Sequence, residues 1–150
     1  MTEKKPFSTV LFLAFFTSSL LALVVAFFVG LLNQKFPQFQ SLHTLELQKS
    51  LSWDNPSWIF LQGLFPALYE EVFFRGILHW ACLKKGEKTA WIVPNLFFGV
   101  FHLHPYLAPI YFLIGMFFSY WRVRSQGLVA PIIAHFAFNL TGILLILSGL

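Results

Sequence analysis

Long apolar runs separated by short polar segments form the pattern of this chain. The runs cover residues 7–32, 57–83, 89–104, 105–121 and 128–148. An α-helix rises about 1.5 Å per residue, so the first run can cross the ~30 Å hydrocarbon core of a bilayer with some tilt. The pattern predicts an all-α fold, a polytopic transmembrane helix bundle of about five membrane helices.

The polar segment at residues 33–56 divides the chain into two parts. Residues 1–56 are expected to form an N-terminal transmembrane anchor helix and an interfacial loop, and residues 57–150 the rest of the bundle. A cleavable signal peptide is the rival interpretation of the first run, because Lys4 and Lys5 precede it. Its apolar core would usually have only about 7–15 residues, so the anchor is favoured.

Composition and charge agree with a membrane protein. Hydrophobic residues make up 57% of the chain and charged residues 11%, whereas about 25% of an average soluble domain is charged. The net charge of +4 does not indicate nucleic-acid binding, because the basic residues lie in short clusters between the apolar runs. Five spans put these clusters on one side of the membrane: Lys4, Lys5, Lys84, Lys85, Lys88, Arg122 and Arg124. The positive-inside rule then predicts a cytoplasmic N-terminus.

Three charged residues, Glu70, Glu71 and Arg75, interrupt the second run near its centre. A charge in the middle of a membrane helix costs at least about 2.5–3.5 kcal/mol, so these residues need partners or a function. Glu71 and Arg75 are spaced i,i+4 and can pair on one helical face. Glu70 is offset by about 100° and must find a partner on another helix, hold a proton or face a wet cavity. Burial disfavours an ionised carboxyl group, which suits Glu70 to general acid or base chemistry.

Further polar residues can reach the same level of the bundle. His102 ends the third run, and His135 and Asn139 lie i,i+4 on one face of the fifth. Counted from the cytoplasmic helix ends at about 1.5 Å per residue, Glu70 and His102 lie about 20 Å deep, Asn139 about 17 Å and His135 about 11 Å. These four residues can therefore share one pocket. The alternatives are an ion pair that locks two helices and histidines that only form interhelical hydrogen bonds.

The remaining histidines and the aromatic residues are expected to be structural. His79 and His104 fit interhelical hydrogen-bonding groups, because a lone histidine in a membrane helix usually has that role. His43 is expected to be a loop residue. Phe98 and the other aromatic residues are expected to lie in the core or face lipid.

Three segments on separate apolar runs form an ordered pattern. They are Glu70-Glu71-Val72-Phe73-Phe74-Arg75-Gly76, Phe98-Gly99-Val100-Phe101-His102 and His135-Phe136-Ala137-Phe138-Asn139. In this order they resemble the three motifs of the CAAX-protease/bacteriocin-processing (CPBP) family of intramembrane proteases. The resemblance covers roughly residues 57–148, and it implies an all-α membrane bundle around a water-accessible cavity in which a peptide bond is hydrolysed.

The resemblance also implies roles for single residues. Glu70 would be the general base that activates water, and His102 would help to hold or polarise that water. His135 and Asn139 would stabilise the oxyanion of the tetrahedral intermediate, where the loss of one donor typically costs about 10²–10³ in rate.

Glu71 and Arg75 would keep the motif helix in place. The family has been described both as metalloproteases and as glutamate-dependent proteases. Two histidines and a glutamate could ligate zinc, a possible divalent metal here. The His-Glu-x-x-His spacing typical of zinc proteases is absent from the sequence. Metal-independent catalysis is therefore favoured, and no cofactor is assigned.

The leading hypothesis is an intramembrane endopeptidase that acts on a membrane-associated peptide or protein. It would be a multi-pass protein of the lipid bilayer, in the cell (inner) membrane, in an oligomeric state that the sequence does not fix. The alternative is a non-catalytic bacteriocin-immunity or membrane assembly protein on the same bundle. A proton-coupled transporter is disfavoured, because such proteins commonly carry an internal repeat and none is visible.

Overall fold

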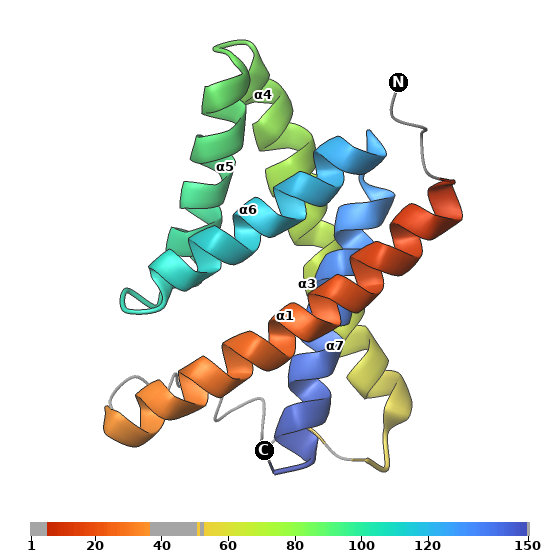
Figure 1. Cartoon of the computed structure of the whole chain (residues 1–150), viewed down its shortest axis with the longest axis vertical. Helices are drawn as coiled ribbons and strands as arrows, with labels where there is room; N and C mark the ends of the chain where they lie inside the picture. Colours follow the sequence, from red (N-terminus) through yellow and green to blue (C-terminus); the bar gives the residue numbers. More distant parts are fainter. Residues whose placement is uncertain (1–5, 37–50, 52, 150) are drawn as a thin grey trace.

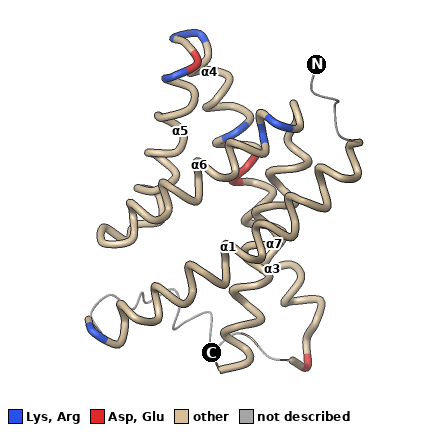
Figure 2. The backbone as a smooth tube through the Cα atoms, in the orientation of Figure 1, with Lys and Arg blue, Asp and Glu red and all other residues tan. Residues whose placement is uncertain are grey.

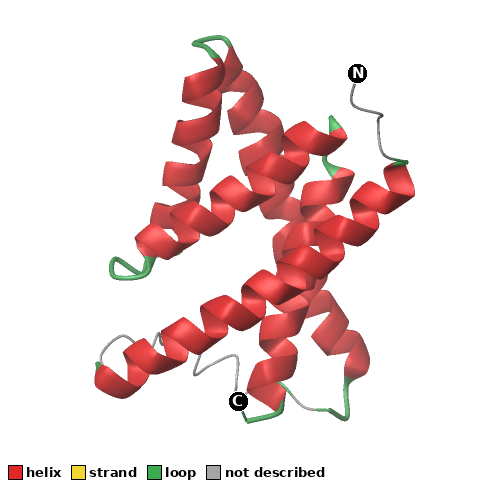
Figure 3. Ribbon diagram, in the orientation of Figure 1, coloured by secondary structure: helices red, strands yellow, loops and turns green. Residues whose placement is uncertain are grey.

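The computed structural model describes residues 6–36, 51 and 53–149. Its elements are α1 Phe7–Lys35, α3 Pro56–Glu71, the π-helix η2 Val72–Leu78, α4 His79–Leu83, α5 Glu87–Phe101, α6 Ala108–Ser125 and α7 Val129–Leu147. α3, η2 and α4 follow one another without a gap and form one long helix. The described residues thus form five helical rods and no strand (Figure 3), which confirms the predicted all-α bundle. The predicted interfacial loop lies largely outside the described residues, as does His43.

The helix boundaries differ from the predicted runs at the connection between α5 and α6. α5 ends at Phe101, so His102 follows the helix instead of lying in it, and α6 begins only at Ala108. Pro109 lies in the first turn of α6, where a proline loses no helical hydrogen bond. The turn before α6 contains Leu103 with a positive φ of 51°.

Capping and turn residues determine where the long second helix begins and ends. The side chain of Asn55 accepts a hydrogen bond from the backbone N–H of Trp58 at 3.0 Å, and Pro56 occupies the first turn. After α4 the chain reverses at Gly86, whose φ of 116° is readily adopted only by glycine. α4 and α5 then pack side by side as a hairpin (Figure 1).

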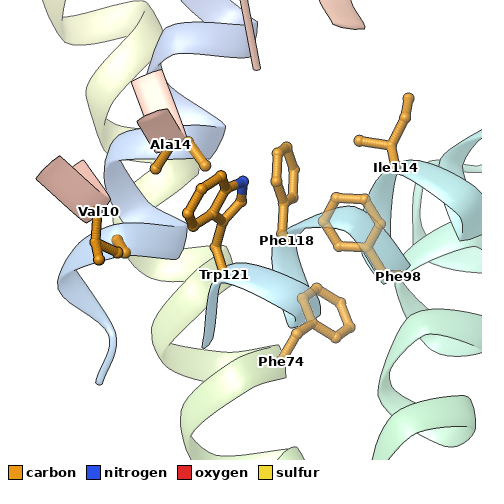
Figure 4. Packing of buried hydrophobic residues seen from close by; sticks show 9 residues of the cluster. Val10, Ala14, Phe74, Phe98, Ile114, Phe118 and Trp121 are labelled. Carbon is orange, nitrogen blue, oxygen red and sulfur yellow. The ribbon is translucent and has the colours of Figure 1, made fainter. Parts of the chain in front are cut away.

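α1 packs diagonally across α7 (Figure 1). Its buried residues recur at every fourth position and are small: Val10, Ala14, Ser18 and Ala22. Small residues at this spacing let two membrane helices approach closely. Figure 4 shows Val10 and Ala14 beside Trp121 of α6, with Phe118 on another side of the indole. α1 is therefore anchored on the core by its first four turns.

The distribution of polar and apolar side chains is the reverse of that in a soluble protein. Phe12, Leu20 and Phe27 are 60%, 63% and 64% exposed, whereas Glu71 and Arg75 are 0% exposed. Large exposed apolar surfaces mark contact with lipid or another apolar partner. Among the described helices, α1 and α7 are long and apolar enough to cross a membrane. These features fit a membrane protein, and the number of five crossings stays a prediction.

Basic residues gather at one end of the bundle. Figure 2 shows them at the turn between α4 and α5 and at the end of α6, which lie at the same end as the start of α7. Lys35, at the end of α1, lies at the opposite end. This separation is the arrangement that the predicted topology requires.

Candidate active site

The centre of the bundle holds a buried ion pair between Glu71 and Arg75. Arg75 Nη1 donates to Glu71 Oε1 at 3.0 Å, and both side chains are 0% exposed. The i,i+4 pair predicted from the sequence is therefore formed. Arg75 Nη2 donates to Asn95 Oδ1 at 3.1 Å and to the backbone oxygen of Gly115 at 2.8 Å. The guanidinium thus has partners on three rods, which offset the cost of burying its charge.

Asn95 is the residue that sequence reasoning missed at this site. It lies on α5 and is 0% exposed. Its Nδ2 donates to Ser119 Oγ of α6 at 3.0 Å and to the backbone oxygen of Trp91 at 2.6 Å, while its Oδ1 accepts from Arg75. The available signal was an amide in the middle of an apolar run, since such groups usually hydrogen-bond across helices.

Aromatic rings and a glycine fit closely around Arg75. Its guanidinium carbon lies 4.4 Å from the ring centroid of Phe98 and 5.5 Å from that of Phe118; both rings appear in Figure 4. Rings at this distance stabilise a cation through their quadrupole. A Cβ atom at Gly115 would lie 2.9 Å from Asn95 Oδ1 and 3.0 Å from Arg75 Nη2. Only glycine leaves room for the guanidinium there.

His135 lies between the two glutamates. Its Nδ1 is 2.8 Å from Glu71 Oε1, and its Nε2 is 4.0 Å from Glu70 Oε2. The imidazole also stacks on Phe118, with ring centroids 4.5 Å apart. Glu70 thus lies beside an imidazole of another helix and lines a cavity. The two side chains thus meet although the residues were predicted at depths about 9 Å apart, because long side chains on crossing helices can bridge such a difference.

His102 and Asn139 are each held by a backbone oxygen. His102 Nδ1 lies 2.7 Å from the oxygen of Phe98, and the ring of Tyr111 stacks on the imidazole with centroids 4.0 Å apart. Asn139 Nδ2 donates to the oxygen of Gly63 at 3.3 Å. The latter bond ties α7 to α3, and it uses only one of the two amide hydrogens.

Glu70, His102, His135 and Asn139 line one cavity of about 800 Å³. The prediction that these four residues share a pocket is confirmed. Aromatic side chains form much of the wall around them, including Tyr69, Phe73, Phe101, Tyr111 and Phe138. Glu71 and Arg75 do not line the cavity; they lie behind His135. A cavity of this size can admit a peptide segment.

The motif helix is not a regular α-helix, contrary to the prediction for this run. Residues Val72–Leu78 form a π-helix that begins immediately after Glu71. Arg122 Nε of α6 donates to the backbone oxygen of Arg75 at 3.3 Å. π-Helical turns are rare and are frequent at functional sites, where they change the direction of side chains. Here the irregular turns lie directly between the acidic residues of the motif and the rest of the helix.

The other predicted histidine roles have different outcomes. His79 Nδ1 of α4 lies 3.0 Å from the backbone oxygen of Ala90 on α5, so the predicted interhelical hydrogen bond is confirmed. His104 lies in the turn before α6 and packs against Tyr106, with ring centroids 6.4 Å apart. Phe98 is 1% exposed, in agreement with a core position.

The described part of the chain contains no group of three or more His, Cys, Asp or Glu side chains arranged to hold a metal ion. Of the residues considered as ligands, His135 and His102 both use Nδ1 in hydrogen bonds within the protein. The atoms that remain as possible metal ligands are the Nε2 atoms of these two histidines and the carboxylate oxygens of Glu70.

The sequence matches one family model, described as Type II CAAX prenyl endopeptidase Rce1-like, over residues 52–141. The matched segment is more than half of the chain. It contains the six residues of the three motifs, namely Glu70, Glu71, Arg75, His102, His135 and Asn139. Comparison with curated proteins found no match, and comparison with solved structures found none either.

Proposed function

Since the chain belongs to the family of type II CAAX prenyl endopeptidases of the Rce1-like kind, we propose that it hydrolyses a peptide bond of a membrane-associated peptide or protein inside its cavity. The resemblance to the CPBP family is thereby confirmed at the level of the family. The observation that carries the proposal is the shared cavity of Glu70, His102, His135 and Asn139, with Glu70 4.0 Å from His135. A carboxylate, two imidazoles and an amide around one space can activate water and stabilise an oxyanion.

Glu70 is the general base in this proposal. Its carboxylate takes a proton from a water molecule while the water oxygen attacks the carbonyl carbon of the scissile bond. The proton then passes from Glu70 to the leaving nitrogen, and the C–N bond breaks, which yields a carboxylic acid and an amine and leaves Glu70 ionised again. His102 positions the water: its Nδ1 hydrogen goes to the oxygen of Phe98, so a neutral ring presents a lone pair at Nε2 that accepts a hydrogen from water.

His135 and Asn139 provide the donors for the oxyanion. An ionised Glu71 can only accept a hydrogen bond, so the contact at 2.8 Å assigns a hydrogen to Nδ1 of His135. A donor at Nε2 then requires a doubly protonated imidazolium. Asn139 contributes the amide hydrogen that Gly63 does not use.

Glu71 and Arg75 are positioning residues. Neither lines the cavity, and both act on the reaction through the orientation of His135. Arg75 fixes Glu71 from one side, and Glu71 fixes the plane and the protonated nitrogen of the imidazole. The aromatic neighbours exclude water from this contact, which strengthens it.

The first experiment compares peptide cleavage by the wild type with that by Glu70→Gln. Both proteins are purified and reconstituted in liposomes with a library of membrane-anchored peptides, and products are identified by mass spectrometry. Glutamine is nearly isosteric, so the variant should stay folded while cleavage falls by at least about 10²-fold, the lower range for a lost general base. Glu87→Gln is the matched control, since Glu87 is exposed in the first turn of α5.

The result distinguishes the competing functions. If Glu70→Gln cleaves as fast as the wild type, or keeps full function in cells, the catalytic proposal fails and the immunity or assembly role takes its place. A chelator arm tests metal dependence: loss of cleavage that zinc reverses would make Glu70, His102 and His135 ligands. Cleavage that survives the chelator and disappears in Glu70→Gln supports a glutamate-dependent reaction.

The proposed topology puts the N-terminus in the cytoplasm and the protein in the cell (inner) membrane. It rests on the basic residues at the turn between α4 and α5 and at the end of α6. Basic loops are retained on the cytoplasmic side during insertion.

A further inference from the structure

The cavity extends well beyond the groups proposed for catalysis. α7 contributes His135, Phe138, Asn139, Gly142, Ile143 and Ile146 to its wall. Steps of three, one, three, one and three residues keep these positions on one helical face. At about 1.5 Å per residue the face is about 16 Å long. The catalytic groups of α7, His135 and Asn139, lie within its first five residues.

The direction of this extension follows from the contacts between α3 and α7. Glu71 contacts His135, and Gly63 contacts Asn139. Residue numbers therefore fall along α3 while they rise along α7, and the two helices are antiparallel here. Gln62, which also lines the cavity, consequently lies away from Glu71, toward the later residues of α7. We call the part lined by Gln62, Gly142, Ile143 and Ile146 the distal end of the cavity.

The distal end has the chemistry of an apolar subsite. Of its four residues only Gln62 is polar, and none is charged. Gly142 is half-buried in the wall, and a Cβ atom placed on it would have no atom of the described residues within 4 Å. By contrast, a Cβ atom at Gly63, on the facing helix, would lie 3.2 Å from the ring of Phe136. Gly142 is therefore not required by helix packing, and it leaves open space beside the cavity.

We propose that the distal end binds an apolar side chain of the peptide substrate and that Gly142 sets the largest side chain admitted. Gly142 lies three positions after Asn139, which is about 4.5 Å along the helix. An extended peptide advances about 3.3 Å per residue. The side chain in question thus belongs to a residue one or two positions from the scissile bond. This inference rests on the proposed function, because it uses Asn139 to locate that bond.

The test measures how the size of one substrate residue affects cleavage by Gly142→Leu. The probes are acylated, fluorescent peptides that share one sequence cleaved by the wild type and carry Ala, Val, Leu, Phe or Trp at one position near the cleaved bond. Gly142→Leu should raise KM for the Phe and Trp peptides by at least about tenfold, as expected when a pocket loses the room for one side chain. Cleavage of the Ala peptide should stay within about twofold, since its side chain does not reach the filled space.

Gly30→Leu is the matched control, because a Cβ atom at Gly30 on α1 also has no atom of the described part of the chain within 4 Å, and Gly30 does not line the cavity. Gly142→Leu overturns the proposal if it slows all peptides equally or behaves like Gly30→Leu. The same peptides are titrated against Glu70→Gln, with and without Gly142→Leu, by fluorescence anisotropy. Size-dependent binding without any cleavage by the wild type would retain the subsite and reject the protease. Absence of both binding and cleavage for every peptide would reject both.

Discussion

Replacement of Asn95 by leucine tests whether the buried network controls the reaction. Leucine has the same branched arrangement of four side-chain heavy atoms as asparagine, and it favours a helix slightly more. It removes the acceptor that Arg75 Nη2 uses at 3.1 Å and the donor that Ser119 Oγ uses at 3.0 Å. Asn95 does not line the cavity. Any effect on catalysis must therefore pass through Arg75 and Glu71 to His135.

The expected magnitude follows from the bonds that are lost. An interhelical hydrogen bond in a membrane contributes about 0.6 kcal/mol on average and at most about 1.7 kcal/mol. Asn95 makes two of them, to the rods that carry Arg75 and Ser119. The bond to the guanidinium belongs to the stronger, charge-assisted class of about 1.5–3 kcal/mol. We expect a loss of about 2–4 kcal/mol in the free energy of unfolding.

The catalytic effect should appear in kcat and not in KM. Arg75 keeps its bond to the oxygen of Gly115, so the ion pair with Glu71 is loosened and not abolished. A displacement of His135 of the order of 1 Å would lower kcat by about tenfold to hundredfold. KM should stay unchanged, because the walls of the cavity are intact.

Unfolding is followed by titration with SDS in mixed micelles, and cleavage of one fluorescent peptide gives kcat and KM. Asn33→Leu is the control, because Asn33 Oδ1 on α1 has no hydrogen-bond partner among the described residues. A loss of less than about 0.5 kcal/mol for Asn95→Leu, the range of an ordinary surface substitution, would refute the network. If Asn95→Leu lowers the stability strongly but leaves kcat unchanged, the buried network does not control the position of His135.

Three further predictions concern other parts of the molecule. Gly115→Ala puts a Cβ atom 3.0 Å from Arg75 Nη2 and should destabilise the protein by about 1–3 kcal/mol, measured by the same titration. Glu71→Gln keeps the shape but removes the charge beside His135, so we expect kcat to fall by about 10²–10³, as for a lost oxyanion donor. A cysteine introduced at Gly86, in a chain that lacks Cys82, should react with a membrane-impermeant maleimide only from the cytoplasmic side.

Each of these has a control and a contradicting outcome. Gly30→Ala should leave the stability unchanged, because no atom of the described residues lies within 4 Å of its Cβ position. If Gly115→Ala is as stable as the wild type, the guanidinium of Arg75 is not tightly enclosed. Glu87→Gln should keep full activity. If Glu71→Gln is equally active, the charge of Glu71 is not required for catalysis. A cysteine at Gln34 should label from the opposite side, and labelling of Gly86→Cys from outside the cell would invert the topology.

The sequence predicted those parts of the site that depend on local spacing. Glu71 and Arg75 pair because positions four apart share a helical face, and three ordered motifs were enough to bring Glu70, His102, His135 and Asn139 to one cavity. Contacts that depend on how helices cross could not be obtained in this way. The bond between His135 and Glu71 joins residues 64 positions apart.

The role of Asn95 was hidden for the same reason. Its partner Arg75 lies 20 residues away, on a rod whose orientation is altered by the π-helix after Glu71. The residue types of Val72–Leu78 would also fit an α-helix, so they give no local reason to expect a π-helix there. The end of α5 and the start of α6 were misplaced, because His102 and Pro105 are compatible with both a helix end and a turn.

The dispersal of Arg75's partners along the chain sets an order for assembly during synthesis. The oxygen of Gly115 emerges from the ribosome 40 residues after Arg75, and His135 emerges 64 residues after Glu71. At about 5–20 residues per second, the first interval lasts about 2–8 s. For that time the second helix carries two acids and one base with only its own i,i+4 pair to neutralise them. In a newly made chain this helix must therefore stay at the membrane interface or beside the insertion machinery until α6 has been synthesised. The residues that form the site thus also determine when the bundle can assemble.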